Sequence, residues 1–282
     1  MNNFAGYFHL AHNKLTIRVN NMKKNNCMIS LFALVTLLLF NSPAFSVTNG
    51  ELDLEDHPHV GLLIFDINGN PAFRCSGTLI LPTIILTAGH CTDGGRVWFD
   101  TDEATIRADG YPFEGIRSIE FSNIYTSPNY NPLAFFLNDI GLVELETPVI
   151  VDVYGTLPNA DQLNELARRR GHSDQTFTAV GYGLQQINPV FVQSALDRMF
   201  ARPHLIQINA PGLTGDFSML LSNNHSTGGT CFGDSGGPNF MGESDTIGGV
   251  TSFGLNGNCA GTGGVYRLDR QHDLDWINSF LP

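Results

Sequence analysis

Short runs of apolar residues, each bounded by turn residues, recur along the chain from residue 47 onward. Residues 59–65, 73–81 and 83–87 are rich in Leu, Ile and Thr, a composition typical of β-strands. Asn68-Gly69-Asn70 predicts a hairpin turn between the first two. Further strands are predicted at 96–100, 116–121, 140–145, 177–182, 247–253 and 264–268, whereas helical spacing is confined to 161–170 and 269–281. The pattern therefore predicts a mainly β protein.

The first 46 residues have the composition of a targeting segment. Met22-Lys23-Lys24 gives a basic start, residues 28–40 are apolar, and Ala44-Phe45-Ser46 supplies the small residues of a signal-peptidase site. The apolar stretch is shorter than the roughly 20 residues of a membrane span. We therefore expect a leader and signal peptide over 1–46, no membrane anchor, and a secreted protein, extracellular or periplasmic. Residues 1–21 precede the signal, so Met1 and Met22 both stay open as translation starts.

Charge is distributed unevenly between the leader and the rest of the chain. Four of the 15 basic residues lie before Ser46, which leaves 11 basic against 27 acidic side chains after it, a formal charge of −16. No lysine occurs in that part. Because such a surface repels nucleic acid and anionic membranes, neither is expected as a partner. A soluble acidic monomer is expected instead.

The number of cysteines fits an oxidising compartment. Cys27 lies within the signal, and four others remain: Cys75, Cys91, Cys231 and Cys259. Four cysteines allow three pairings, among which spacing does not choose. A zinc site is the competing interpretation, but neither a Cys-x-x-Cys motif nor paired histidines support it. Residues 66–70 misplace the glycine of a calcium loop and lack its closing glutamate. No metal is expected.

Three short segments carry candidate chemistry: Thr87-Ala88-Gly89-His90-Cys91, Asn138-Asp139-Ile140-Gly141-Leu142 and Gly233-Asp234-Ser235-Gly236-Gly237-Pro238. The glycines around Ser235 let the backbone approach a substrate closely. Read alone, Gly233 to Gly237 also matches the nucleophile elbow of α/β-hydrolases. In those enzymes the catalytic residues follow one another along the chain in the order Ser, Asp, His. They also need a helix directly after the serine, which the Gly-Gly-Pro sequence disfavours here. Here the order is His90, Asp139, Ser235.

That order, in those three contexts, resembles the chymotrypsin/trypsin family of serine peptidases. The resemblance runs from about residue 47 to the end and includes Gly181-Tyr182-Gly183, similar to a Gly-Trp-Gly of the family. It implies an all-β fold with two antiparallel Greek-key six-stranded β-barrels and a C-terminal α-helix. The peptidase domain would span 47–282, with the N-terminal barrel at about 47–150 and the C-terminal barrel and helix at about 151–282. The active site would lie in the cleft between the barrels.

The resemblance also implies residue roles. His90 would be the general base, Asp139 would orient its ring, and Ser235 would attack the substrate. Backbone N–H groups of Gly233 and Ser235 would form the oxyanion hole. Ser252 matches a family serine that hydrogen-bonds the catalytic aspartate. The implied disulfides are Cys75–Cys91 and Cys231–Cys259.

Specificity and activation are further implications of the resemblance. Trypsin-like members have an aspartate six residues before the nucleophile, where this chain has Gly229, followed by Thr230. Ser252, Phe253, Gly254 and Gly264 match pocket-wall positions, so the pocket is expected to be open and neutral and to accept large neutral side chains. Val47-Thr48-Asn49-Gly50 stands where the family has its activating N-terminus. Its amine is expected to pair with Asp234, and signal peptidase itself is expected to expose Val47.

The sequence thus predicts a secreted serine endopeptidase that acts on proteins or peptides and needs no cofactor. Two alternatives stay open: a non-catalytic secreted binding protein on the same fold, and an esterase that uses the same three residues.

Overall fold

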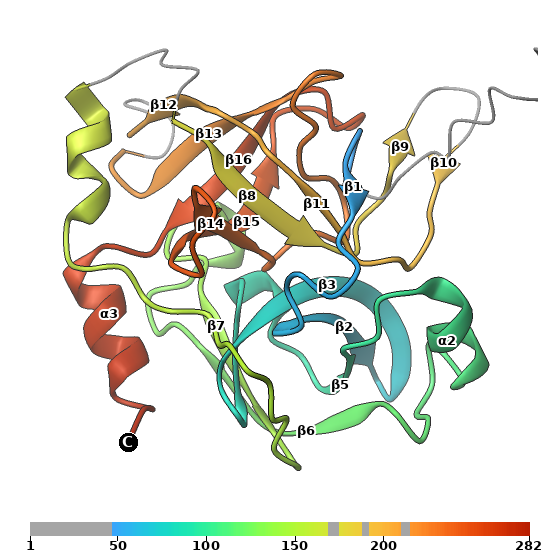
Figure 1. Ribbon diagram of the computed structural model, residues 1–282. Helices are drawn as coiled ribbons and strands as arrows, with labels where there is room; N and C mark the ends of the chain where they lie inside the picture. The colour runs from blue at the N-terminus through green and yellow to red at the C-terminus, as the bar shows by residue number, and fades with distance from the viewer. Residues whose placement is uncertain (1–46, 169–174, 188–191, 210–214) are drawn as a thin grey trace, which may run out of the picture. The chain divides into compact units, whose positions relative to one another are not determined.

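The computed structural model describes residues 47–168, 175–187, 192–209 and 215–282. The predicted leader, residues 1–46, lies outside these ranges. Within them the chain is mainly β, as Figure 1 shows. None of the described helices is long and apolar enough to cross a bilayer.

The first half of the described chain forms a closed six-stranded barrel, as predicted. Its strands are β2 (Val60–Ile67), β3 (Asn70–Leu81), β4 (Ile84–Thr87), β5 (Gly95–Trp98), β6 (Ile119–Thr126) and β7 (Gly141–Leu145). They close in the order β2-β3-β4-β7-β6-β5, and every neighbouring pair is antiparallel.

The sequence of β2 does not alternate between apolar and polar residues, because both faces of the strand are buried. Leu63 and Phe65 belong to one buried cluster, whereas Leu62 and Ile64 belong to another that includes residues of the second half. Because successive strand residues point to opposite faces, one face fills the barrel and the other packs against the second half.

The second half is one eight-stranded sheet in the order β1-β11-β8-β14-β15-β16-β13-β12. Its strands are β1 (Glu51–Leu52), β8 (Phe177–Gly181), β11 (Met199–Ala201), β12 (Leu205–Ile208), β13 (Ser218–Asn223), β14 (Pro238–Met241), β15 (Ile247–Gly254) and β16 (Gly261–Arg267). A separate ribbon pairs β9 (Gln186–Ile187) with β10 (Val192–Gln193).

The prediction of a second closed six-stranded barrel is corrected by this arrangement. The sheet curls, and a single bridge between Thr176 and His204 links the start of β8 to the start of β12. Pro203 has no N–H to donate, so the strand breaks there into β11 and β12. β11 then continues the sheet outward to β1, the N-terminal segment. The chymotrypsin-like fold itself is confirmed.

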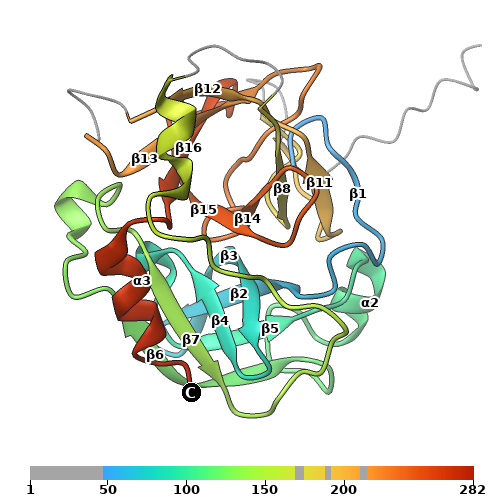
Figure 2. The same ribbon diagram turned by 60° about the vertical axis from the view of Figure 1, so that its left-hand side comes forward.

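Helix α3 (Gln271–Asn278) confirms the predicted C-terminal helix. It buries Leu274 and Ile277, and just beyond it Phe280 packs on Tyr125 of β6 with ring centroids 4.5 Å apart. Figure 2 shows the helix alongside β6 and β7. The predicted helix at 161–170 is a 3-10 helix, Gln162–Arg168. Helix α2 (Glu103–Ala108) was not predicted; Asp102 caps it by accepting from the Thr105 N–H.

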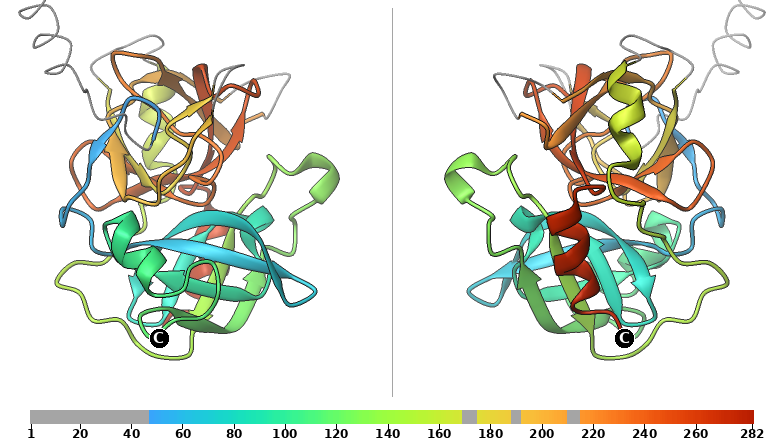
Figure 3. Two further views of the ribbon diagram at one scale, coloured as in Figure 1. Left: turned by 90° about the vertical axis from the view of Figure 1, so that its right-hand side faces the viewer. Right: turned by 90° about the vertical axis from the view of Figure 1, so that its left-hand side faces the viewer.

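Arg198, just before β11, ties the N-terminal segment to the barrel. Its Nε donates to Asp53 Oδ2 at 2.7 Å, and its Nη1 donates to the carbonyls of Val60 and Phe99. Arg198 and Asp53 are both fully buried. Figure 3 shows β1, in blue, at the edge of the second sheet, from where the chain continues into the barrel. A buried pair of this kind fixes the path of the segment that precedes β2.

A pH-dependent loss of stability is expected from His59. This side chain is fully buried, and neither ring nitrogen has a hydrogen-bond partner among the described residues. Burial lowers the pKa of His59 to about 4. An unfolded histidine takes up its proton near pH 6.5, so unfolding is favoured as pH falls from about 6.5 through about 4. The loss attributable to His59 is about 3 kcal/mol.

Urea unfolding at pH 7 and pH 4.5 measures this effect. His59→Phe should reduce the difference in unfolding free energy between the two pH values. His225→Gln, at an exposed histidine, is the matched control and should leave it unchanged. An unaltered difference in His59→Phe would contradict the assignment.

Candidate active site

His90 lies in a 3-10 turn, Gly89–Cys91, that directly follows β4. The disulfide between Cys91 and Cys75 of β3 fastens this turn to the barrel. The backbone N–H of His90 donates to Asp139 Oδ1 at 2.9 Å, and the ring Nδ1 lies 2.9 Å from Asp139 Oδ2. Because the carboxylate accepts at Nδ1, the neutral ring keeps its proton there, and Nε2 has a free lone pair.

Asp139 lies two residues before β7, and the pairing of Thr87 with Gly141 brings the end of β4 to the start of β7. Asp139 is fully buried. Ser252 Oγ, from β15 of the second sheet, donates to Asp139 Oδ2 at 2.5 Å. The structure therefore brings His90, Asp139 and Ser252 into one hydrogen-bonded chain that spans both halves.

Ser235 lies in the loop between Cys231 and β14, on the second half. Its carbonyl accepts from the Ser76 N–H of β3 at 2.8 Å, and Gly236 N–H donates to the Thr251 carbonyl at 2.8 Å. These bonds hold the loop against both halves at once. Ser235 is half-buried and lines the same cavity as His90.

The loop also presents two unengaged donors. In the described ranges, the backbone N–H groups of Gly233 and Ser235 donate to no protein acceptor. Gly233 has φ = 100°, a conformation that favours glycine, and its carbonyl is held by Ser76 Oγ at 3.0 Å. Two N–H groups two residues apart can converge on one anionic oxygen.

The shared cavity has a volume of about 600 Å³. Of the six predicted pocket residues, four line it: Thr230, Ser252, Phe253 and Gly254. Gly264 does not; a Cβ there would meet the Phe253 ring, and Gly263 lines the cavity instead. Gly264 is thus a neighbour of two lining residues, Phe253 and Gly263.

Gly229, the predicted position at the floor of the pocket, has no side chain and is not among the lining residues. A Cβ at Gly229 would lie 2.6 Å from Cβ and Oδ1 of Asn223, which does line the cavity. Sequence reasoning missed Asn223. The sequence alone does not place this residue beside Gly229, because folding brings the end of its strand, β13, to that position.

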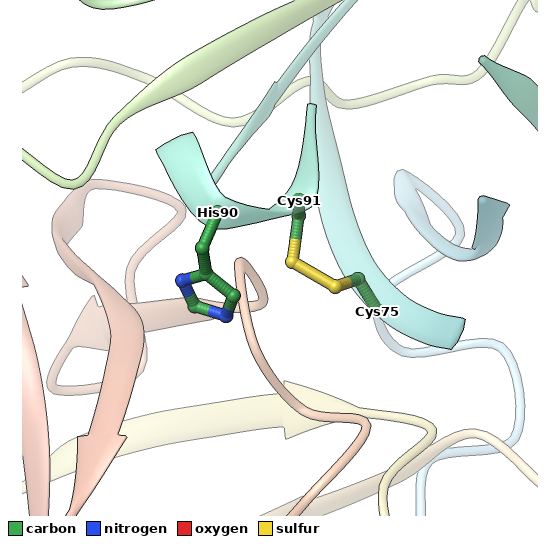
Figure 4. A group of neighbouring side chains, drawn as sticks. All are labelled: Cys75, His90 and Cys91. Atoms are coloured by element: carbon green, nitrogen blue, oxygen red, sulfur yellow. A yellow bond between two sulfur atoms is a disulfide. The ribbon is translucent and has the colours of Figure 1, made fainter. Parts of the chain in front are cut away.

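Both predicted disulfides, Cys75–Cys91 and Cys231–Cys259, are confirmed. Figure 4 shows the first beside the His90 ring. Cys75, Cys91 and His90 place possible ligand atoms within 4.8 Å of one another. Because the two sulfurs are bonded to each other, they do not offer the thiolates that hold zinc.

A second histidine–carboxylate pair, half-buried His57 and buried Asp53, has a different environment. Asp53 is shared with Arg198, and the His57 ring stacks on Phe240 with centroids 5.4 Å apart. Among the described residues that line the cavity with Ser235, the histidine is His90. The His57–Asp53 pair therefore anchors the N-terminal segment.

Asp234 and Val47 both lie against the pair of strands β8 and β11. Val47 is fully buried with Met199 and Ala201 of β11. Met199 pairs with Gly181, and a Cβ at Gly181 would lie 3.2 Å from Asp234 Cγ. Asp234 is fully buried and accepts from the N–H groups of Gly183 and Cys231 at 2.7 and 2.8 Å. Burial raises the pKa of Asp234 to about 6.

A two-part β fold whose halves meet at a buried Asp–His pair and a loop serine defines the chymotrypsin-like class of proteins. The family model described as Trypsin matches residues 54–277 of this chain. Brachyurin from Leptuca pugilator is 32% identical over 230 residues, which covers 79% of this chain and 92% of brachyurin. Collagenase from Hypoderma lineatum is 24% identical over 260 residues, covering 89% and 95%.

A solved structure titled as an HL collagenase at 1.7 Å resolution has the same fold, with a TM-score of 0.65, 22% identity, and coverage of 83% of this chain and 97% of that one. The chain belongs to the trypsin family of serine endopeptidases. It is a trypsin-like serine protease, and its substrates are peptides. The two disulfides are consistent with secretion.

Proposed function

We propose that the protein hydrolyses peptide bonds through a His90–Asp139–Ser235 triad and a covalent acyl-enzyme. The assignment depends on one observation. Hydrogen bonds link Ser252 to Asp139 and Asp139 to His90, and the His90 ring lines the same cavity as Ser235.

In this mechanism Nε2 of His90 removes the proton of Ser235 Oγ as the oxygen attacks the scissile carbonyl. Asp139, desolvated and held by Ser252, stabilises the imidazolium that forms. The free N–H groups of Gly233 and Ser235 bind the oxyanion. His90 then protonates the leaving amine, and water repeats the sequence to release the acyl group.

The substrate class follows from the chemistry of the cavity. Its described lining residues include Phe253 and the Cys231–Cys259 disulfide and contain no carboxylate. A cationic side chain would lose its hydration there without gaining a partner. We therefore assign cleavage after large neutral residues such as Phe, Tyr, Leu and Met.

The enzyme is proposed to act as a secreted monomer that begins at Val47. Removal of the leader, 1–46, leaves the domain 47–282, with its N-terminal barrel at about 47–150 and its second unit and helix at about 151–282. The buried carboxylate of Asp234 is the proposed partner of the Val47 amine.

A fluorophosphonate probe followed by a peptide-library digest tests this function. The probe should label Ser235, and the digest should show cleavage after large neutral residues. An unlabelled protein would instead be a binding module. A labelled protein that hydrolyses only esters would be an esterase. A digest dominated by cleavage after Arg would overturn the substrate class.

A further inference from the structure

Asn223 is one of the polar residues that line the cavity beside Ser235. Asn223 lines the cavity but is only 2% exposed. A lining residue so little exposed belongs to the enclosed part of the cavity rather than to its mouth. Asn223 therefore faces the part of the cavity that receives the end of a substrate side chain.

Asn223 fills the space that a side chain at residue 229 would occupy. Gly229 has none, and a Cβ there would lie 2.6 Å from Oδ1 of Asn223, closer than packed atoms approach. The absence of a side chain at Gly229 therefore makes room for Asn223. The side chain in this space comes from β13 rather than from the loop before Cys231.

The orientation of the amide is fixed by its neighbours. Nδ2 donates to the Thr230 carbonyl at 2.7 Å, and Oδ1 accepts from the Thr48 hydroxyl. Because a carbonyl oxygen only accepts, the nitrogen must face Thr230 and the oxygen must face Thr48. The second proton of Nδ2 has no acceptor among the described residues.

The N-terminal segment helps to hold this amide. Thr48 forms a bridge with Gly229, whose N–H donates to the Thr48 carbonyl at 3.0 Å. The Thr48 hydroxyl also lies 3.0 Å from the Gly229 carbonyl. Thr48 is thus a positioning residue for Asn223.

We propose that Asn223 is the specificity-determining residue of the cavity. It offers the substrate a neutral N–H donor, and so selects large uncharged side chains whose tip accepts a hydrogen bond, tyrosine ahead of phenylalanine. This inference rests on the proposed function, since it names the side chain which that active site prefers. One neutral hydrogen bond corresponds to about a two- to tenfold preference.

Substitution of the amide by a carboxylate of the same shape provides the test. Peptide substrates that differ only in the residue before the scissile bond (Tyr, Phe or Arg) are compared by kcat/KM. Asn223→Asp should raise the Arg-to-Phe ratio by at least about 100-fold, because the new charge pairs with the guanidinium. Asn224→Asp adds the same charge at the neighbouring, exposed residue and should leave the ratio within about threefold of wild type.

A second variant, Asn223→Ala, provides the test if Asn223→Asp folds poorly. Asn223→Ala removes the donor and should bring the Tyr-to-Phe ratio to about one. Each ratio is independent of the fraction of active protein. An unchanged Arg-to-Phe ratio in a fluorophosphonate-labelled Asn223→Asp protein overturns the proposal. If that variant does not label, an unchanged Tyr-to-Phe ratio in Asn223→Ala overturns it. Failure of the wild type to label overturns the proposed function instead.

Discussion

Replacement of Ser235 by alanine is expected to lower kcat/KM for peptide hydrolysis by about 10⁴- to 10⁶-fold. The variant keeps the oxyanion donors and the cavity but has no oxygen to form the acyl-enzyme. His90→Ala should cost a similar factor, because Ser235 then has no base. The double variant should be little worse than either single one, since the two residues act as a unit.

Matched measurements separate chemistry from folding. Ser244→Ala removes an exposed hydroxyl and should retain full activity. Urea unfolding should give the same midpoint for Ser235→Ala and wild type, because Ser235 Oγ forms no hydrogen bond with the described residues. Activity of Ser235→Ala within tenfold of wild type would refute the assignment of the nucleophile.

Much of the first barrel could be predicted from the sequence, and the reason is physical. Its first two strands, β2 and β3, have eight and 12 residues and are separated by the turn residues Asn68-Gly69, so pattern and structure coincide there. In the second half, β1, β9, β10 and β11 have only two or three residues each. Segments this short carry no periodicity, and distant strands define them through pairing.

The residues that line the pocket were also hard to predict, because strand pairing rather than local sequence decides which of them face the cavity. Motifs locate residues near the reacting atoms, but a bulge between Thr251 and Phe253 shifts the pairing of β15 with β16 by one residue. Gly254 consequently faces Gly263, and Gly264 falls under the Phe253 ring. A one-residue slip exchanges the two faces of a strand. Asn223 was missed because only the folded chain brings β13 beside Gly229.

Activation at the N-terminus is the second large effect that we expect. Asp234 is a buried carboxylate that accepts two backbone hydrogen bonds but has a raised pKa, because burial outweighs those bonds and the charge of Arg74. A free ammonium at Val47 would supply the missing positive charge. Ionised Asp234 would then hold the loop that carries Gly233 and Ser235.

The side chain of Val47 fixes the position of the proposed N-terminus. It is fully buried and packs against Met199 and Ala201 of β11.

Asp234→Asn is therefore expected to lower kcat/KM by about 10²- to 10³-fold in the protein that begins at Val47, because the buried ammonium loses its partner. Asp152→Asn, at an exposed aspartate, is the matched control and should be fully active. A protein that begins one residue earlier, at Ser46, should show a similar loss, since it has no free amine at Val47, the proposed partner of Asp234. N-terminal sequencing of the secreted active enzyme should read Val47-Thr48-Asn49-Gly50. Equal activity of the proteins that begin at Ser46 and at Val47, or an active enzyme with another N-terminus, would contradict direct activation by signal peptidase.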